Sequence, residues 1–366
     1  MARKQKQKPI LTMGVELETY SIDVSENRIC RDLHFPRKAT VEKGEKFTRD
    51  WSIGSEYNSK VFNTIRESFF LLKTGLRKYT EFREKNGPND HYVIFPIGGW
   101  VDRFAGTHFH LAVKGRKLSY PEAKELAGYI HDYIPFLIAL CGNSPVWREK
   151  LTHYSSNRLL RGSEKYCKPT KRGVLYKHHF RELTYNRENK KKPPTLEIRI
   201  ADASLPEYVV AALCVLRAIA LKWVRQKEVL NQSTHANYLK ARDHAIRLGP
   251  KAKIAWTNHW VSVPHYVDLF FRKYKDELEE MDIPEEIIRT FKYLKKEWNQ
   301  AEVIRAAAEK YQRKHRPTWQ RQFAKRYVIA IEELLDGNSF ERFAHILGVK
   351  LPNIDRTWLG RKESNW

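Results

Sequence analysis

The chain has 366 residues, a net charge of +24, and hydrophobic side chains at 42% of its positions. This length provides one large domain or two ordinary ones with a sizeable core. The excess of Lys and Arg favours polyanions, acidic substrates or phosphates as partners, although a charged fraction of 30% also fits a heat-adapted surface. A membrane-spanning protein is excluded, because the most apolar runs are too short (residues 134–141) or carry two basic residues (residues 208–224).

The cysteines are widely separated and form no CxxC pair, which predicts reduced thiols and a cytoplasmic location. Cys141 is interpreted as a core thiol rather than a nucleophile, since nothing near it forms a Cys/His pair. Residues 1–9 are expected to form a flexible basic tail, and no apolar segment follows that would make them a signal peptide.

The pattern of apolar residues predicts strands mixed with helices through residue 230. Strands are expected over residues 13–20, 51–61, 91–97, 106–113 and 195–200, and helices over residues 63–84, 121–139 and 206–230. Ser119 is expected to cap the second helix and Pro135 to kink it. A polar stretch follows the first strand up to residue 50. The long basic segment between residues 142 and 195 is interpreted as a functional or disordered loop that contains short strands.

Residues 231–234 (Asn-Gln-Ser-Thr) mark the expected boundary between two domains. Residues 10–230 would form the first domain, and residues 231–366 a basic, Trp-rich helical domain. Beyond the boundary the pattern is helical nearly throughout, over residues 236–248, 266–281, 284–298, 301–315, 319–335 and 340–347.

Several predicted strands are apolar on one face and ionisable on the other, because side chains alternate along a strand. The ionisable positions are Glu16 and Glu18, Glu56, His108 and His110, and Glu197 and Arg199. Carboxylates about 7 Å apart on one strand face repel unless a cation lies between them. The spacing therefore predicts a divalent metal site or an acid/base pair on the open face of a sheet that helices cover on its other side.

Each of these strands also has a simpler interpretation. Glu16 and Glu18 could form a solvated acidic edge or a metal-free, glycosidase-type pair, but the latter leaves the other two strands unexplained. His108 and His110 could be a zinc pair or ordinary strand histidines, and the zinc site lacks a third spaced ligand.

Together, these segments resemble the glutamine synthetase/glutamate–cysteine ligase superfamily of ATP-dependent carboxylate–amine ligases. Residues 14–18 (GVELE) resemble its opening GVExE strand, residues 106–110 (GTHFH) its GxHxH strand, and residues 195–202 (TLEIRIAD) its closing (R/T)xExRxxD strand. Residues 143–147 and 156–158 are similar to a segment of the family-2 glutamate–cysteine ligases, and residues 50–59 look more like the putative amidoligase branch.

The resemblance covers about residues 10–225 and implies that residues 10–230 are the catalytic domain. The expected fold is α+β: a six-stranded antiparallel sheet, curved into a half-funnel and backed by helices, with a C-terminal all-α region. Two or three Mg²⁺ or Mn²⁺ ions would bridge the β- and γ-phosphates of ATP. The γ-phosphate would pass to a glutamate-like carboxylate, and an amine would displace it from the acyl phosphate.

The resemblance also assigns roles to individual residues. The expected metal ligands are Glu16, Glu18, Glu56, His108 and Glu197, which suits the preference of Mg²⁺ for carboxylate oxygens. Arg199 would hold the γ-phosphate through its planar fork, His110 would support the nucleotide, and Arg158 would contact phosphate or carboxylate.

Two positions depart from the family pattern. Thr195 stands where the family commonly has an arginine, so another cation must supply that charge, with Arg158, Arg181 and Arg187 as candidates. Leu17 stands where many family-2 ligases have glutamate. These departures affect the expected glutamate and cysteine specificity rather than the type of reaction.

Residues 310–326 hold seven Lys and Arg and no acid, interleaved with Tyr311, Trp319 and Phe323. Because cations and aromatic rings bind single-stranded nucleic acid or RNA, an alternative function is a nucleic-acid-binding protein on an inactive ligase scaffold. The simpler interpretation is a helical domain that buries these rings and exposes a basic face. A third is that this lobe recruits an acidic macromolecule, a protein tail or an RNA, to the ligase centre. A second copy of the chain is a further candidate partner.

Overall fold

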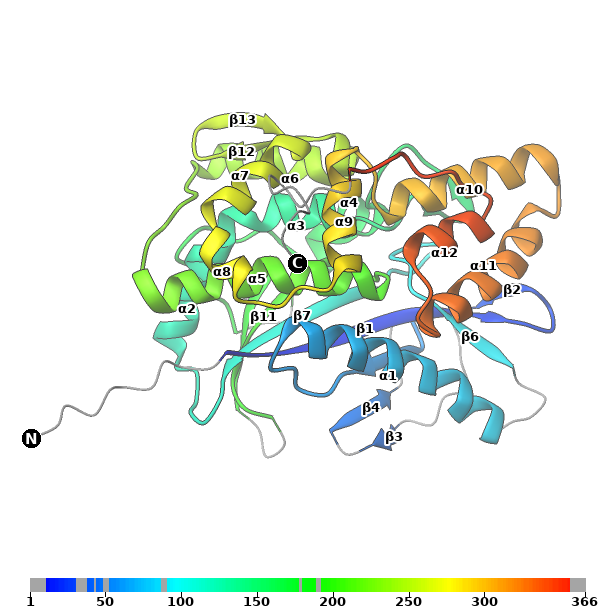
Figure 1. Ribbon diagram of the computed structural model, residues 1–366, viewed down its shortest axis with the longest axis horizontal. Coiled ribbons are helices and arrows are strands. Elements are labelled where there is room, and N and C mark those ends of the chain that lie inside the picture. Colours follow the sequence, from blue (N-terminus) through cyan, green and yellow to red (C-terminus); the bar gives the residue numbers. More distant parts are fainter. Residues whose placement is uncertain are drawn as a thin grey trace, which may run out of the picture.

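The computed structural model describes residues 11–30, 38–42, 44–48, 53–86, 91–177, 180–188 and 192–355. The fold is α+β, as predicted: an antiparallel sheet carries helices on one side, above β1, β7 and β11 in Figure 1. The predicted basic tail and the Asp50-Trp51 start of the amidoligase-like segment lie outside the described residues.

The main sheet has nine strands in the described part of the chain, in the order β10-β11-β7-β1-β5-β4-β3, with β2 and β6 also paired to β1. The strands are β1 (Leu11–Asp23), β2 (Arg28–Cys30), β3 (Lys38–Glu42), β4 (Glu45–Thr48), β5 (Ser55–Asn58), β6 (Tyr92–Phe95), β7 (Gly106–Val113), β10 (Leu183–Asn186) and β11 (Thr195–Asp202). All of these pairings are antiparallel. The expected number of strands, six, was too low, and β2, β3 and β4 lie in the polar stretch that follows β1.

Strand β1 lies at the centre of the sheet, between β7 and β5. Its side chains alternate as predicted, since Val15 and Leu17 are buried whereas Glu16 and Glu18 are partly exposed. The register places Glu16 opposite His108 of β7 and opposite Asn58 of β5. The ionisable positions of neighbouring strands therefore share one face of the sheet.

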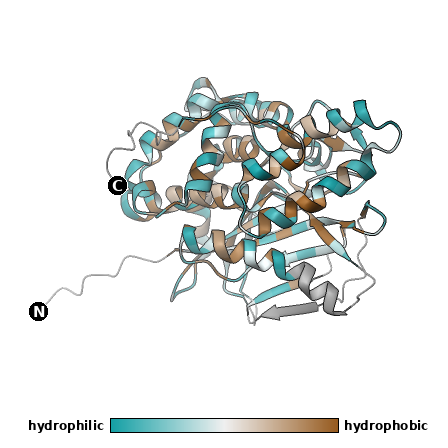
Figure 2. Cartoon of the chain, turned by 45° about the vertical axis from the view of Figure 1, so that its right-hand side comes forward, coloured by the Kyte–Doolittle hydropathy of each residue, from teal (hydrophilic) through white to brown (hydrophobic). Residues whose placement is uncertain are grey.

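Helices cover the apolar face of the sheet. The helices involved are α1 (Ile65–Asn86), α2 (Tyr120–Ile130), α3 (Ile134–Cys141) and α5 (Pro206–Gln226). Their buried side chains and those of the strands form a continuous hydrophobic cluster. Figure 2 shows hydrophobic segments where the helices face the sheet and one another, with hydrophilic residues turned outward. The helices thus bury the apolar face of the sheet, and the opposite face can hold polar side chains.

The predicted helix over residues 121–139 is two helices, α2 and α3, joined by a 3-10 turn at His131–Tyr133. Ser119 caps α2 as predicted, and its side chain and that of Glu122 form a reciprocal capping box. Pro135 falls in the first turn of α3 rather than in a helix interior, where its ring would disrupt the hydrogen-bond ladder.

The basic segment after residue 142 contains a helix that the sequence did not predict. It includes the short strands β8 (Val146–Trp147) and β9 (Lys150–Leu151), followed by helix α4 (Asn157–Tyr166), which Ser156 caps. Gly162 lowers the intrinsic helix propensity of this stretch. A Cβ at Gly162 would lie 3.2 Å from Phe104, so the glycine permits a close tertiary contact that local periodicity does not reveal.

Most of the chain beyond residue 231 is helical, as predicted. The helices are α6 (His235–Leu248), α7 (Val263–Lys273), α8 (Lys275–Glu279), α9 (Glu285–Lys295), α10 (Gln300–Lys314), α11 (Trp319–Leu335) and α12 (Phe340–Ile346). Two details differ from the prediction. A hairpin, β12 (Lys253–Trp256) and β13 (His259–Ser262), interrupts the helices, and the expected helix over residues 266–281 is divided into α7 and α8.

The C-terminal helices share the core of the sheet-bearing part. The ring of Phe323 stacks on Trp100 with centroids 5.2 Å apart, and Tyr327 meets Phe95 at 4.5 Å. The side-chain amide of Asn299 donates to the carbonyl oxygen of Ala139 at 2.9 Å. The division into domains at residues 230/231 stays a prediction, and these contacts supply a way to test it.

Across the described residues, no helix has an apolar stretch long enough to cross a bilayer. All four cysteines are free thiols. Cys141 is buried, its thiol donates weakly to the carbonyl oxygen of Tyr208, and burial raises its pKa well above the usual range. This agrees with its interpretation as a core thiol, whereas the cytoplasmic location stays a prediction.

Candidate active site

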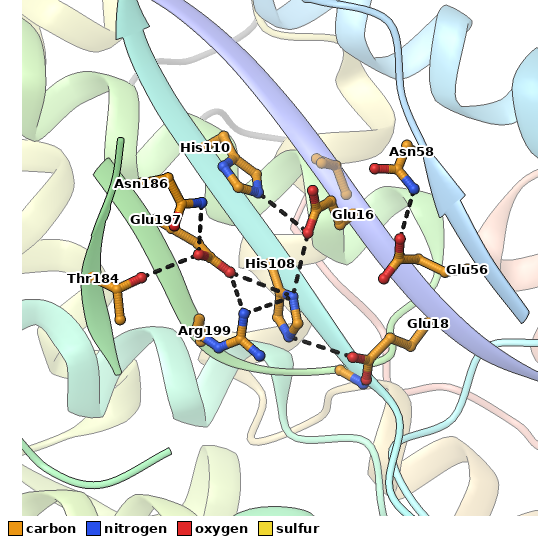
Figure 3. A network of polar contacts seen from close by, with 12 residues as sticks. Glu16, Glu18, Glu56, Asn58, His108, His110, Thr184, Asn186, Glu197 and Arg199 are labelled. Atoms are coloured by element: carbon orange, nitrogen blue, oxygen red, sulfur yellow. Dashed lines mark hydrogen bonds and ion pairs between the residues drawn. The ribbon is translucent and has the colours of Figure 1, made fainter. Parts of the chain in front are cut away.

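Three neighbouring strands bring Glu16, His108, His110 and Glu197 together on the open face of the sheet (Figure 3). Glu16 Oε2 lies 3.8 Å from His108 Nδ1 and 3.6 Å from His110 Nε2. Glu197 Oε1 lies 3.6 Å from the same His108 Nδ1. His108 and Glu197 are almost fully buried, whereas Glu16 and His110 are partly exposed. The side chains that the sequence grouped by alternation therefore form one cluster.

Arg199 closes this cluster on the β11 side. Its Nη1 donates to Glu197 Oε1 and lies 3.3 Å from His108 Nδ1. The register of β11 against β7 shifts between Ile198 and Ala201, and the Arg199 backbone N–H donates to the carbonyl oxygen of Glu182 at 3.0 Å. Such irregularities re-aim side chains next to functional sites. The Arg199 Nε is buried and has no hydrogen-bond partner in the described part of the chain.

The two histidine rings differ in the hydrogen-bond partners of their nitrogens. An arginine only donates hydrogen bonds, so His108 Nδ1 accepts from Arg199 and the ring proton lies on Nε2, 3.7 Å from Glu18 Oε1. His110 Nδ1 lies 3.0 Å from Thr195 Oγ1, whereas its Nε2 is buried without a hydrogen bond to any described residue. Among the described residues, the ring nitrogen that lacks a hydrogen-bond partner is therefore His110 Nε2, which lies 3.6 Å from Glu16 Oε2.

Glu18 and Glu56 extend the acidic face toward β5. They are directly opposite each other on β1 and β5, where like charges repel. Glu18 Oε2 accepts from the Gly106 backbone N–H at 2.6 Å, and Glu56 Oε1 accepts from Asn58 at 2.7 Å and from Thr48 at 3.1 Å. Both carboxylates are thus held by the protein while remaining on the same face as Glu16.

The environment favours ionised carboxylates and a neutral His108. Burial alone would raise the pKa of Glu16, but the nearby imidazoles and Lys192 outweigh it and lower the pKa well below its usual range. Burial likewise opposes ionisation of Glu197, whereas the Arg199 charge and the imidazoles lower its pKa to about 2. Burial and Arg199 together lower the pKa of His108 to about 4.

A divalent metal fits this set of side chains. Ligand atoms of Glu16, His110 and Glu197 all lie within 4.8 Å of one another. Two carboxylates suit Mg²⁺ or Mn²⁺, and one imidazole is tolerated by Mn²⁺. The unbonded Nε2 of His110 supplies the observation that points to a ligand at this position.

Arg158 approaches the site from the first turn of α4. Its Nη2 donates to the Arg199 carbonyl oxygen at 3.1 Å, and Nη1 is buried with no hydrogen-bond partner among the described residues. The guanidinium lies against Gly106, where a Cβ would come within 2.4 Å of Nη2. Glycine before the His108 strand thus makes room for the Arg158 side chain.

Asp202, at the end of β11, holds the start of α4 in place. This buried carboxylate accepts from the Asn143 backbone N–H at 2.8 Å and from the hydroxyls of Ser144 and Ser156 at 2.7 and 2.8 Å. Burial raises its pKa despite these bonds and the charge of Arg158. Ser156 is in turn the N-cap of α4, so Asp202 positions the helix that carries Arg158.

In the described part of the chain, no contact joins the remaining basic candidates, Arg181 and Arg187, to the acidic cluster. Arg181 stacks on Tyr176 at 4.4 Å and donates to the carbonyl oxygen of Pro169 at 3.4 Å, and no described contact joins it to the acidic residues. Arg187 is exposed. Arg187 follows Asn186, the register partner of Thr195, and the identity of the cation that serves residue 195 stays a prediction.

The structure adds residues that the sequence analysis did not assign to the site. Thr184 and Asn186 of β10 donate to Glu197 Oε2 at 3.1 and 2.8 Å, and Lys192 Nζ lies 2.8 Å from Glu16 Oε1. Thr184 and Asn186 are two residues apart, like the other site pairs, and that spacing could have indicated them. Lys192 lies outside the strands and carries no such signal.

The aromatic residues of the basic segment 310–326 are largely buried. Tyr311 and Phe323 belong to the hydrophobic core, and Trp319 packs on Trp100 with ring centroids 5.7 Å apart. The Lys and Arg residues of this segment are exposed. This is the arrangement of a helical region with a basic surface, and it leaves few exposed rings on which bases could stack.

Comparison with known proteins gives a match in structure only. No family model and no curated protein matches the sequence. Among solved structures, the complex between the prokaryotic ubiquitin-like protein Pup and its ligase PafA is similar with a TM-score of 0.58 and 12% identity, over 93% of this chain and 80% of that one. The chain has the fold of the carboxylate–amine ligases.

Two further structures with this ligase fold are similar over nearly the whole chain. A glutamate–cysteine ligase from Francisella tularensis in complex with AMP has a TM-score of 0.55 and 11% identity, over 93% of this chain and 92% of that one. A bifunctional glutathione synthetase from Pasteurella multocida has a TM-score of 0.57 and 13% identity, over 92% of this chain and 55% of that one. The similarity thus extends past residue 225, where the sequence resemblance ends.

Proposed function

We propose that this protein is an ATP-dependent carboxylate–amine ligase that forms an amide bond through an acyl phosphate. The observation that carries the proposal is the convergence of Glu16, His110 and Glu197 beside Arg199 on the open face of a sheet with the ligase fold. Phosphoryl transfer depends mainly on positioning and on neutralising the charge that develops on the phosphate oxygens. A cluster of carboxylates beside a guanidinium suits that task.

In this proposal Glu16, Glu197 and His110 bind one divalent ion, and Glu18 and Glu56 serve a neighbouring one. Mg²⁺ or Mn²⁺ would neutralise the β- and γ-phosphates of ATP when bound. His108, whose Nδ1 accepts from Arg199, positions the Arg199 guanidinium rather than acting as the main imidazole ligand. This reverses the roles that the sequence suggested for the two histidines.

Arg199 would hold the γ-phosphate, since its Nε is buried without a hydrogen-bond partner in the described residues and its charge is anchored on Glu197. Arg158, with Nη1 likewise unbonded, would contact the transferred phosphate or the substrate carboxylate. An amine then attacks the acyl phosphate: the new C–N bond forms, the C–O bond to phosphate breaks, and the amine releases a proton.

The proposed acid is glutamate-like, by resemblance of the site motifs. One of the similar structures is a ligase in complex with a small protein, Pup, and another is a glutamate–cysteine ligase. The basic exposed face of residues 310–326 suits an acidic macromolecule as one of the two substrates.

The test is ADP release across a panel of amino acids, amines and acidic peptides, with Glu16→Gln and Glu197→Gln compared with wild type. Both substitutions should abolish Mg²⁺-dependent turnover. Glu188→Gln is the matched control, because Glu188 is exposed and pairs with Lys117 at 2.7 Å. Circular dichroism should show that the variants are folded. If both variants turn over ATP like the wild type, the metal assignment is wrong.

The alternative function is a nucleic-acid-binding protein on an inactive scaffold. The same substrate panel distinguishes it from the ligase. It predicts no ADP release with any substrate and RNA binding that weakens steeply with salt. The burial of Tyr311 and Phe323 removes the stacking platforms that such binding uses. We therefore retain the ligase as the proposed function.

A further inference from the structure

Lys192 occupies the side of Glu16 that the histidines leave free. Its Nζ lies 2.8 Å from Glu16 Oε1 and 3.3 Å from Asn58 Oδ1. The other carboxylate oxygen, Oε2, faces His108 and His110. An ammonium group thus shares one carboxylate with the group of atoms that fits a metal ion.

The chain holds the backbone of Lys192 close to the site, and its side chain is half exposed. Pro193 and Pro194 join Lys192 to Thr195, the first residue of β11, and each proline restricts the backbone dihedral φ. The Lys192 side chain is 55% exposed, in contrast to 16% for Arg199. A lysine side chain has a flexible four-carbon stem and a compact charge. The ammonium can therefore change partners without a change in the strand.

Arg199 and Arg158 are more deeply buried than Lys192. Arg199 is anchored on Glu197, and Arg158 lies packed against Gly106 and bonded to the Arg199 carbonyl oxygen. In the described part of the chain, Arg181 has no contact with the carboxylates. Lys192 is the half-exposed cation beside Glu16, and it is three residues from Thr195, the position that lacks a positive charge.

We propose that Lys192 is an exchangeable cation: it neutralises Glu16 in the metal-free site and moves to an anionic group of the nucleotide or substrate when a divalent ion binds. The proposal rests on the ligase function proposed above. A divalent ion and an ammonium on the same carboxylate repel each other, so metal binding weakens the Lys192–Glu16 pair. An incoming phosphate or carboxylate then offers the released ammonium a new partner.

This exchange predicts opposite effects of one substitution on two ligands. Lys192→Met keeps the apolar stem and removes the charge. Without nucleotide, Mn²⁺ should bind the variant about fivefold more tightly, because the competing half-exposed ion pair is gone. With Mn²⁺ saturating, ADP or a non-hydrolysable ATP analogue should bind about tenfold more weakly, because a charge-assisted contact to the anion is lost. A residue with only a structural role would not strengthen metal binding.

The experiment uses the full-length chain, with Mn²⁺ binding measured by electron paramagnetic resonance and nucleotide binding by calorimetry. Lys192→Arg, which keeps the charge, should restore most of the nucleotide affinity. Lys117→Met is the matched control, because Lys117 is an exposed lysine that pairs with Glu188 rather than with a carboxylate of the site. It should leave both affinities unchanged.

Unchanged or weaker Mn²⁺ binding by Lys192→Met overturns the proposal, and so does unchanged nucleotide affinity. These results are distinct from failure of the ligase function. Suppose that the wild type binds Mn²⁺, that Glu16→Gln abolishes this binding, and that Lys192→Met has no effect. The metal site would then be supported and the cation exchange would be refuted. If neither the wild type nor Lys192→Met binds Mn²⁺, both proposals fall.

Discussion

His110 Nδ1 lies 3.0 Å from the hydroxyl oxygen of Thr195, while Nε2 of the same ring faces Glu16 at 3.6 Å. This contact with the hydroxyl fixes the orientation of the ring, and Nε2 has no hydrogen-bond partner among the described residues. Partners of this kind orient metal-binding histidines. Thr195, where the family commonly has an arginine, thus has a role of its own.

Thr195→Val removes this hydroxyl with little change in shape. We expect Mn²⁺ affinity to fall about tenfold or more, the usual effect of losing a partner that orients a ligand histidine. Isothermal titration calorimetry measures the change. Thr195→Ser retains the hydroxyl and should bind Mn²⁺ nearly as the wild type does. Equal affinity of the valine variant and the wild type would show that His110 is not held in this way.

Gly106→Ala tests the packing of Arg158. The added Cβ would lie 2.4 Å from Arg158 Nη2, so the guanidinium must shift. We expect ATP turnover to fall about 100-fold, because misplacement of about 1 Å near reacting groups has effects of this size. Mn²⁺ binding should be retained.

Gly128→Ala is the control for this substitution. Gly128 lies in α2, and a Cβ there meets no atom within 4 Å. Alanine should stabilise the protein by about 0.5–1 kcal/mol through helix propensity and leave turnover unchanged. Normal turnover of Gly106→Ala would remove Arg158 from the proposed chemistry.

The buried pair of Glu182 and Arg242 tests the predicted domain boundary, because it joins residues on its two sides. Arg242 Nε donates to Glu182 Oε2 at 3.0 Å, and the carboxylate also accepts from Thr170 and Tyr238. Glu182→Gln leaves the buried guanidinium without its counter-charge, so the free energy of unfolding should fall by about 3–5 kcal/mol.

Urea unfolding followed by fluorescence and circular dichroism should show one transition that shifts as a whole, because the parts share a core. Glu188→Gln, at the surface, should change stability by less than about 0.5 kcal/mol. Two transitions, of which one shifts, would instead support residues 231–366 as an independent folding unit.

Glu122 gives a prediction for the pH dependence of stability. Hydrogen bonds from Arg116 and Ser119 lower the pKa of this partly exposed carboxyl to about 2, against 4.5 ordinarily. Its ionised form therefore stabilises the folded state above pH 4.5, and the contribution is lost as pH falls toward 2.

Glu122→Gln tests this pH dependence, because it preserves the capping box without the charge. The difference in unfolding free energy between wild type and variant, at most about 1 kcal/mol at pH 6, should shrink steadily below pH 4.5. A difference independent of pH would contradict this.

Alternation and spacing were sufficient to predict much of the site. Glu16 and Glu18, His108 and His110, and Glu197 and Arg199 are pairs two residues apart, so each pair had to share a strand face, and the structure has them on one face. The Ser119 cap was equally local, because a capping box uses residues three apart.

Features that depend on distant contacts were missed. Helix α4 contains Gly162, which is unfavourable for a helix by itself and fits because Phe104 packs against it. Lys192 reaches Glu16 across 176 positions of the chain, and no local pattern records that pairing.

The sequence by itself determined which side chains are buried and which ionisable groups share a strand, because both follow from the order of apolar and polar residues along a single element. Only the tertiary structure decided that β11, β7 and β1 are neighbours in that order, which of the two histidines keeps a free nitrogen, and which cation meets Glu16. The physical reason is that strand pairing, hydrogen-bond partners and charge contacts are set by groups far apart in the chain, and they exist only once the hydrophobic face of the sheet has packed against its helices.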